Sequence, residues 1–454
     1  MSYRSFIAMP GAALLALAAP SAAALVVPDL SAQVAEGARA DLAAASGFVR
    51  AAGLTLPALV LTVPPAAVMA RRLPARAVLG AGLLSLLAGL ACVRYAETVP
   101  LIAAGRVLQG VGAGLVLPAT AVLVWAMRSR FLVALWAGAL AAGLLVAMPL
   151  ALDVLPMSGH WRVALAPFPW PALVALAALV PCLAWRCEPL PVPKQAERGQ
   201  VMLPIAPAAG VAFLAVMATH QWSPGAQLVV ACIALVALCG PALAAGRDAA
   251  AGSPFRCAVV MVTTGLLTYP VTGPLAGLAA AEGAVPPVPF AACGAAALAG
   301  ALLTGRFPER AMHGIVLAGH TLIVVAVLAA LAARVPTEPR TLTAVLVPLG
   351  LGVGAALAAS LRDAGAGAAL FGLGLCFPAL LAGQLLVLSL QAGRWERAHA
   401  ATPAQQAQAL VAGYQTWLLT AAAIALMLAL PPALAARRHR ASGPAKALPE
   451  PVAG

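Results

Sequence analysis

Long runs of apolar residues follow one another along almost the whole chain, and short segments between them hold most of the charged residues. A helix of about 20 apolar residues is long enough to cross about 30 Å of hydrocarbon. The pattern predicts fourteen membrane-spanning helices, at residues 8–28, 43–66, 77–96, 100–124, 131–152, 163–184, 203–220, 226–245, 257–280, 286–304, 312–333, 342–360, 366–390 and 409–434. The fold class that follows is an all-α polytopic membrane protein.

The first apolar run allows a second interpretation. Residues 1–25, MSYRSFIAMPGAALLALAAPSAAAL, also have the form of a secretory signal with an Ala-x-Ala end. We expect this segment to be the first spanning helix. Cleavage there would remove one span and invert the topology derived from the loop charges.

Composition supports a membrane protein and its orientation. The chain is 63% hydrophobic and 9% charged, whereas soluble domains are about half apolar and about a quarter charged. The net charge of +13 does not indicate a nucleic-acid partner, because the basic residues lie in short loops between spans. If the N-terminus is cytoplasmic, most of the 27 Lys and Arg residues also face the cytoplasm. We therefore expect a multi-pass protein of the cytoplasmic membrane with both termini inside.

One basic heptad occurs twice, as RRLPARA at 71–77 and as GRFPERA at 305–311. Each copy connects the second and third spans of a set of six, which predicts two homologous halves related as parallel repeats. The predicted organisation is an N-terminal six-helix bundle (1–185), a linker with two inserted helices (186–252), a C-terminal six-helix bundle (253–435) and a cytoplasmic tail (436–454). Arg72, Arg76, Arg306 and Arg310 are then expected in turns at the cytoplasmic mouth. The alternative is two unrelated basic turns that both obey the positive-inside rule.

The fourth span, LIAAGRVLQGVGAGLVLPAT at 101–120, resembles the arginine-containing motif B of the major facilitator superfamily, specifically its fourteen-helix drug:proton antiporter branch. The matching positions are Arg106, Gln109, Gly110, Gly112, Ala113 and Gly114. Supporting matches are GHWR (159–162), SPFR (253–256), DAGAGAALFGLG (363–374) and ALVAGYQTWLLTAAAIALML (409–428). The resemblance implies two six-helix bundles plus two inserted helices, a monomer in the lipid bilayer, and secondary transport of a small molecule by alternating access without a cofactor.

Two family motifs are altered in this chain. The basic turn resembles motif A, but Arg71 stands where that motif has the Asp that helps to latch the cytoplasmic helix ends. Motif C of the fifth span keeps Gly138, Gly143 and Pro149, and its following Gly-Gly is replaced by Leu152 and Asp153. The glycines of both motifs are expected to pack helices closely and not to bind substrate.

Arg106 lies well within a span, where a charge costs about 2.5–3.5 kcal/mol or more and therefore needs a partner. Asp153 and Asp29 are the carboxylates nearest to its depth, which predicts an ion pair that relays protons or gates the outer side. The alternative is that Arg106 donates only to backbone carbonyls. His320 is the mid-span candidate for proton coupling, and a neutral buried imidazole is its alternative.

The substrate cavity is predicted from polar positions in the C-terminal half. Thr264, Thr268, Thr272, Tyr269 and Gln384 are sparse hydrogen-bonding groups among apolar residues. They suit a lipophilic or amphipathic solute, although the threonines also have the option of bonding back to their own helix. We therefore expect an exporter of drug-like molecules, and the sequence leaves its coupling to protons open.

Other classes of protein fit the sequence less well. No convergent set of catalytic or metal-ligating residues is apparent, so neither an enzyme nor a metal site is expected. No nucleotide-binding loop of the G-x-x-x-x-G-K type occurs, so no nucleotide is expected. The altered motifs keep two alternatives open: a narrow-substrate carrier that protons do not drive, and a non-transporting relative that serves as a sensor or scaffold.

Overall fold

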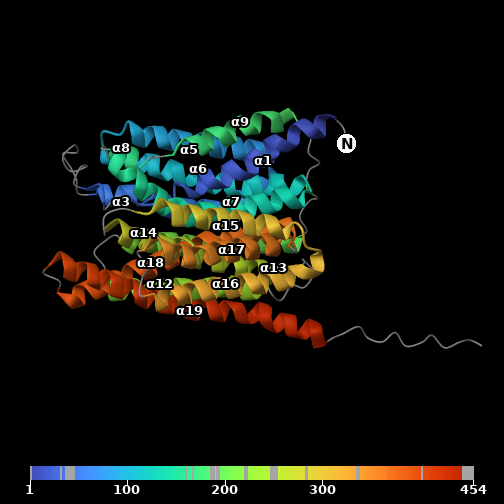
Figure 1. Cartoon of the computed structure of the whole chain (residues 1–454). Helices are drawn as coiled ribbons and strands as arrows, with labels where there is room; N and C mark the ends of the chain where they lie inside the picture. Colours follow the sequence, from blue (N-terminus) through green and yellow to red (C-terminus); the bar gives the residue numbers. More distant parts are fainter. Residues whose placement is uncertain are drawn as a thin grey trace, which may run out of the picture.

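The computed structural model describes residues 3–30, 33–35, 47–158, 161–165, 168–184, 190, 195–218, 223–245, 254–281, 285–333, 338–362, 364–399 and 402–441. The regular structure within these ranges is helical (Figure 1). The helices are α1 (Tyr3–Ala24), α3 (Phe48–Ala52), α4 (Thr55–Arg72), α5 (Ala75–Arg94), α6 (Val99–Ala126), α7 (Arg130–Ser158), α8 (Trp161–Ala164), α9 (Trp170–Ala184), α10 (Gln195–Met202), α11 (Ile205–Ala218), α12 (Pro224–Ala245), α13 (Pro254–Leu267), α14 (Tyr269–Ala281), α15 (Pro287–Thr304), η2 (Glu309–Ala311), α16 (Met312–Ala332), α17 (Pro339–Arg362), α18 (Ala366–Ala398) and α19 (Pro403–Ala441).

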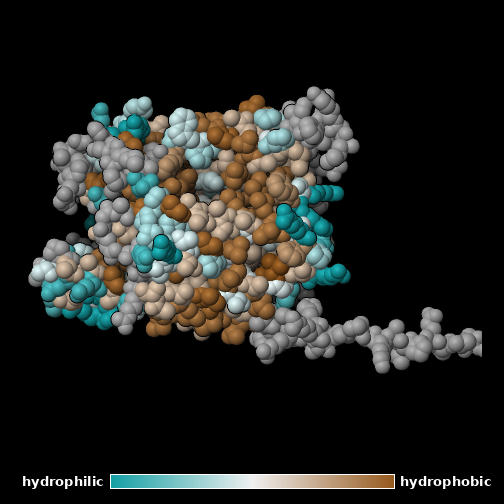
Figure 2. Space-filling model, viewed as in Figure 1, coloured by the Kyte–Doolittle hydropathy of each residue, from teal (hydrophilic) through white to brown (hydrophobic). Residues whose placement is uncertain are grey.

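Twelve helices among the described residues are long and apolar enough to cross a membrane. Two shorter apolar helices, Met9–Ala24 and Trp170–Cys182, lie where the first and sixth spans were predicted. The all-helical fold class is therefore confirmed, whereas the count of fourteen spans is not. Figure 2 shows a broad hydrophobic belt across the middle of the visible face, with hydrophilic residues gathered towards the two ends of the helices.

The helices pair in the same way in the two parts of the chain. In the N-terminal part α6 packs against both α4 and α5, and in the C-terminal part α17 packs against both α15 and α16. The two sets meet where α7 contacts α15 and where α4 contacts α18. Figure 1 shows the N-terminal helices, in blue and cyan, stacked beside the yellow to red C-terminal ones. The boundaries of the halves stay a prediction.

The predicted inserted helices lie along one seam between these sets. Helix α11 packs against both α4 and α18, and α12 packs against α18. At this seam Gly374 of α18 approaches Pro204, whose ring would lie 3.1 Å from a Cβ at that glycine. The insert therefore covers the contact between α4 and α18.

Several helices begin or end at residues other than those predicted for the spans. The second span was predicted to end at residue 66, but α4 continues to Arg72, so Arg71 and Arg72 belong to its last turn. The ninth span is divided into α13 and α14 at Thr268, because Pro270 lacks the N–H that would continue the helical bonding pattern. Helix α18 runs on to Ala398, beyond the predicted residue 390.

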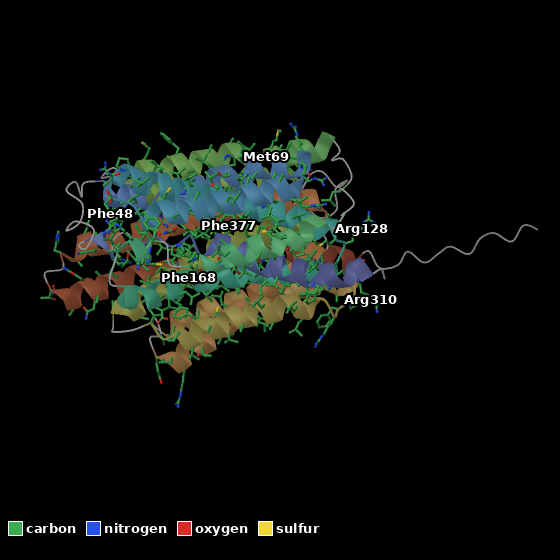
Figure 3. The ribbon with its side chains drawn as sticks, turned by 90° about the horizontal axis from the view of Figure 1, so that it is seen from above. Phe48, Met69, Arg128, Phe168, Arg310 and Phe377 are labelled. Atoms are coloured by element: carbon green, nitrogen blue, oxygen red, sulfur yellow. The ribbon has the colours of Figure 1, made fainter. Side chains whose placement is uncertain are left out.

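The two ends of the helix bundle differ in their charges. Arg310 of the second basic turn and Arg128, which follows α6, lie at one end in Figure 3, and Phe48 lies at the other end. We call the first the basic end and the second the opposite end. Helix α6 runs from the opposite end at Val99 to the basic end at Ala126, which places Arg106 nearer the opposite end.

Candidate functional site

Arg106 is 2% exposed and donates hydrogen bonds to four uncharged oxygens. Its Nε donates to Ala52 O at 2.6 Å, its Nη1 to Leu165 O at 3.2 Å and its Nη2 to Pro28 O at 3.1 Å. Nη1 also donates to Gln109 Oε1 at 2.9 Å. One side chain thereby joins the segment after α1, the last residue of α3 and the residue that follows α8.

The predicted ion pair between Arg106 and Asp153 is not present. Asp153 is half-buried on α7 and is not among the hydrogen-bonding partners of the guanidinium. Asp29 is the carboxylate that interacts electrostatically with Arg106, and its neighbour Pro28 supplies one of the bonded carbonyls. Carbonyls satisfy the arginine because a guanidinium has five N–H donors in a fixed fork that one carboxylate cannot fill.

Gln109, which is fully buried, extends the network to α5. Its Nε2 donates to Gly89 O at 3.4 Å, while its Oε1 accepts from Arg106. A Cβ added at Gly89 would lie 2.6 Å from Gln109 N, so only glycine allows this approach. The motif-B residues Arg106 and Gln109 therefore act as one buried polar unit.

The glycines of α6 lie where the backbones of its neighbours come closest. A Cβ at Gly110 would lie 2.2 Å from Thr55 O of α4, and one at Gly112 would lie 2.5 Å from Leu86 N of α5. A Cβ at Gly114 would lie 2.6 Å from Thr62 Cβ. A side chain of any size would force the helices apart at these points.

The glycines of α7 join it to helices of both halves. A Cβ at Gly138 would lie 2.9 Å from Ala301 Cβ of α15, and one at Gly143 would lie 2.7 Å from Ala24 Cβ of α1. Pro149 is buried on the same helix. Helix α7 is therefore close-packed on its own half and across the seam.

A cavity of about 420 Å³ lies between the two sets of helices towards the opposite end. Residues from the N-terminal part (Asp29, Gln33, Val49, Met148) and from the C-terminal part line it. Tyr269 and Gln384, both predicted for the substrate cavity, are among the latter. A volume of this size is within the range of about 300–1,000 Å³ that is usual for small-molecule sites.

Two polar groups distinguish this cavity. Gln384 Oε1 is buried and has no hydrogen-bond partner. The Asp29 carboxylate lies beside the end of α3, where a Cβ at Gly53 would be 3.1 Å from its Oδ2, and it interacts electrostatically with Tyr269. Gln391 also lines the cavity, and no basic residue does so among the described residues.

The three predicted threonines do not line this cavity. Thr264, Thr268 and Thr272 are at most 2% exposed. Their hydroxyls donate to carbonyls one turn earlier in the chain, those of Val260, Thr264 and Thr268, at 2.9, 2.6 and 3.3 Å. Bonding to a carbonyl one turn earlier is available to any threonine in a helix.

His320 is also away from the cavity, between α16 and α13. It is 1% exposed, its Nδ1 lies 2.9 Å from Val316 O, and its Nε2 lies 3.3 Å from Thr263 Oγ1. The ring is thus hydrogen-bonded within the C-terminal half.

At the basic end the two sets of helices are joined by an ion pair that the sequence did not indicate. Arg130, at the start of α7, forms it with Glu309 of the second basic turn. Within the C-terminal set, Arg362, at the end of α17, donates to Thr304 O at the end of α15 and to Phe307 O of that turn. Arg306 and Arg310 are exposed beside them. The acid within GRFPERA was the one sign in the sequence that this turn forms an ion pair. Its partner Arg130 could not be identified, because it lies far away in the sequence.

The fold has known counterparts among solved structures. No protein-family model and no curated protein sequence matches the chain. The human organic anion transporter MFSD10 (TETRAN) is similar in structure, with a TM-score of 0.59 and 14% identity over 94% of this chain and 100% of that chain.

Two further solved structures are also similar to this chain. The proton:xylose symporter XylE gives a TM-score of 0.54 with 14% identity, covering 94% of this chain and 95% of that chain. The peptide transporter POT gives 0.57 with 16% identity, covering 96% and 94%. These likenesses do not distinguish the fourteen-helix antiporter branch, which stays a prediction. They show that this chain shares the helical fold of these three transporter structures, one of which is described as a major facilitator superfamily protein, and the twelve candidate spans agree with a multi-pass membrane protein.

Proposed function

We propose that the protein is a secondary active transporter that moves a lipophilic or amphipathic small molecule by alternating access. The observation that carries the proposal is the cavity between the two sets of helices, lined by residues of both. At the basic end the same sets are joined by Arg130 and Glu309. A cavity at one end and a closed seam at the other are what an alternating-access carrier needs in one of its states.

The fold alone does not select a substrate, because the three similar structures are described as transporters of an organic anion, of xylose and of peptides. The cavity itself supports a more specific proposal. Asp29 and Gln384 Oε1 present oxygen acceptors among mostly apolar neighbours. A substrate with an apolar body and an amine or another N–H donor would fill the vacant acceptor position.

Export is the direction that we propose. With the basic end facing the cytoplasm, the cavity lies on the outer side, where an exporter would release its substrate and an importer would bind it. The mostly apolar lining, which suits a lipophilic solute, is what favours export. Asp29 is the described carboxylate that lines the cavity, which makes it the candidate for exchanging a proton against substrate. A carrier that protons do not drive is the alternative.

The test is transport of a fluorescent lipophilic amine, ethidium, in proteoliposomes with an imposed pH gradient. Gln384→Leu should raise the half-saturating ethidium concentration about tenfold, the equivalent of one lost hydrogen bond of about 1.4 kcal/mol. Gln415→Leu is the matched control, because this glutamine is half-buried on α19 and does not line the cavity.

Asp29→Asn should abolish the response to the pH gradient, whereas Asp153→Asn should keep it. Transport that ignores the gradient in the unaltered protein would favour the carrier not driven by protons. No ethidium transport, with all variants equally folded by size-exclusion chromatography, would favour the non-transporting sensor or scaffold.

A further inference from the structure

The cavity between the two sets of helices is elongated, because two helix faces form its long walls. On α14 the lining residues run from Tyr269 to Ala281 and recur at every helical turn. On α18 they are spaced in the same way. The α18 residues are Gln384, Val387, Leu388 and Gln391.

The two walls run in the same direction and begin at the same level. A Cβ at Gly372 of α18 would lie 2.8 Å from Met261 Cγ of α13. Further along, a Cβ at Gly383 would lie 3.0 Å from Pro270 Cγ of α14. Residue numbers therefore rise together along both walls, towards the opposite end. Gln384, the chain neighbour of Gly383, lies level with the start of α14, at the inner end of the cavity.

The inner end of the cavity presents oxygen acceptors. Gln384 Oε1 is buried there without a hydrogen-bond partner. The Asp29 carboxylate, which also lines the cavity, interacts electrostatically with Tyr269 at the start of α14. A buried acceptor without a donor is unfavourable, and a negative charge near it favours a donor that is positively charged. A protonated amine has both properties.

The outer end of the same wall presents an amide group, which both donates and accepts hydrogen bonds. Gln391 is two helical turns beyond Gln384, about 10 Å further along α18. It is half-buried and stands where α19 meets α18, since a Cβ at Gly413 would lie 2.7 Å from Gln391 Cα. A neutral hydrogen-bonding group, such as an amide or a hydroxyl, is the match for this end.

The walls between these two ends are apolar. The lining residues there are Gly273 and Pro274 on α14 and Val387 and Leu388 on α18. Their side chains offer no hydrogen bond, so a polar group at this level would lose its water without replacement. A chain of methylene groups fits such a section. At the level of the outer end, a Cβ at Gly277 would meet nothing within 4 Å, so this glycine borders open space.

We infer that the cavity binds an elongated molecule with a protonated amine at one end and a neutral amide or hydroxyl about 10 Å away, joined by an apolar body. Gln384 receives the amine, and Gln391 sets the length of the molecule. The inference rests on the proposed function, because it takes the cavity to be the substrate site. Binding is measured without transport, so the two can fail separately.

The experiment measures the binding of amino amides of increasing length to the full chain in nanodiscs by isothermal titration calorimetry, with empty nanodiscs as the background. In extended 8-aminooctanamide the amine and the amide are about 10 Å apart, and in 4-aminobutanamide about half as far. Affinity should be highest for 8-aminooctanamide, about tenfold above that of the short probe, the equivalent of one hydrogen bond. It should fall again for 12-aminododecanamide, whose amide lies beyond Gln391.

Gln391→Leu removes the outer hydrogen-bonding group. It should raise the Kd of 8-aminooctanamide about tenfold and remove its advantage over 4-aminobutanamide. Gln415→Leu is the matched control, because this half-buried glutamine of α19 does not line the cavity. The control should keep the advantage of the longer probe.

Gly277→Leu tests the same end by filling it. The added side chain enters open space, so the protein should keep its unfolding temperature without probe. The variant should weaken the binding of 8-aminooctanamide more than that of 4-aminobutanamide, since only the longer probe reaches this level. Gly314→Leu is the control, because a Cβ there also meets nothing within 4 Å and Gly314 does not line the cavity.

Three outcomes decide between the inference and the proposed function. Affinity that rises over the whole series of probes would mean that apolar contact alone sets it, and this would overturn the inference. The same follows if the advantage of 8-aminooctanamide survives in both Gln391→Leu and Gly277→Leu, even where ethidium is transported. A length preference without ethidium transport would keep the binding site and overturn the transport.

Discussion

Helices α6 and α17 occupy corresponding places in the two halves, and they carry the same spacing of glycines. The sequences are GVGAG at 110–114 and GLGVG at 350–354. A Cβ at Gly110 would lie 2.2 Å from Thr55 O of α4, and one at Gly354 would lie 2.0 Å from Ala297 O of α15. Both helices therefore meet a neighbour's backbone directly, at distances that no side chain allows.

The same two helices differ in their polar residues. Arg106 and Gln109 stand four residues and one residue before Gly110, the first glycine of GVGAG. The corresponding residues of α17 are Leu346 and Leu349, which are 0% and 1% exposed. Close helix packing thus needs the glycines alone. The arginine has a separate task, which is to join the ends of α1, α3 and α8 on one side of the cavity.

The largest loss of stability is expected when a glycine of the spacing shared by α6 and α17 is replaced. Gly110→Ala and Gly354→Ala should each lower the free energy of unfolding by more than about 3 kcal/mol, because the added methyl meets a backbone carbonyl that cannot move aside. Gly314→Ala on α16 is the control, since a Cβ there meets nothing within 4 Å. The measurement is thermal or denaturant unfolding in detergent. Equal stability of all three variants would mean that the backbones are not in contact.

The next largest loss of stability is expected when Arg106, which α6 has and α17 lacks, is replaced. Arg106→Leu makes α6 like α17 at this position and should cost about 3 kcal/mol, because three buried carbonyls lose their donor while a buried charge is relieved. Arg106→Lys should recover only part of the loss, since an ammonium has three donors in place of a fork. Unfolding of both variants measures this. If Arg106→Leu is as stable as the unaltered protein, the network does not hold the three segments together.

The reverse exchange should have a smaller effect. Leu349→Gln places the counterpart of Gln109 into α17, where no arginine accompanies it. We expect a loss of about 2 kcal/mol, because the buried amide enters an apolar core without a partner. Leu349→Met keeps the volume and should cost much less. A cost of Leu349→Gln no greater than that of Leu349→Met would show that α17 also offers polar partners.

The smallest effect concerns the two basic turns. Glu309→Gln removes an ion pair whose side chains are 64% and 71% exposed, so stability should fall by less than about 1 kcal/mol. If the ion pair is lost only when the basic end opens, the same free energy should raise the population of molecules that are open at that end by up to about fivefold. The rate at which a cysteine introduced at Leu298, between α7 and α15, is labelled would report this opening. The difference in rate between Glu309→Gln and the unaltered protein should be present at low salt and disappear at high salt, because salt screens the ion pair. Glu97→Gln at the opposite end is the control and should change nothing.

Much of the fold could be predicted because it follows from local rules. Apolar runs of spanning length fixed the helices, and the repeated heptad indicated their pairing in two similar halves. The ends of helices were less predictable, as α4 and α18 show by continuing past their expected last residues. A helix continues into the interface wherever its neighbours or its own polar residues support it, and the hydrophobic pattern does not record this.

The site could be predicted only in part. The cost of a charge in hydrocarbon singled out Arg106, and Tyr269 and Gln384 were found from polarity. The expected pair of Arg106 with Asp153 is not present, whereas Asp29 interacts with it electrostatically and backbone carbonyls, the alternative, accept its hydrogen bonds. Which carbonyls would do so was not predictable, because carbonyls are present at every residue and leave no mark in a sequence. The threonines of α13 and α14 were placed in the cavity although their own helix carbonyls satisfy them.

The sequence by itself determined that the chain is a bundle of membrane-spanning helices with a buried arginine and two basic turns. These features depend on length, composition and near neighbours. Only the tertiary structure decided that Asp29, Tyr269 and Gln384 line one cavity, and that Glu309 is paired with Arg130. The physical reason is that burial and pairing depend on which helices meet, and helices from distant parts of the chain make those contacts.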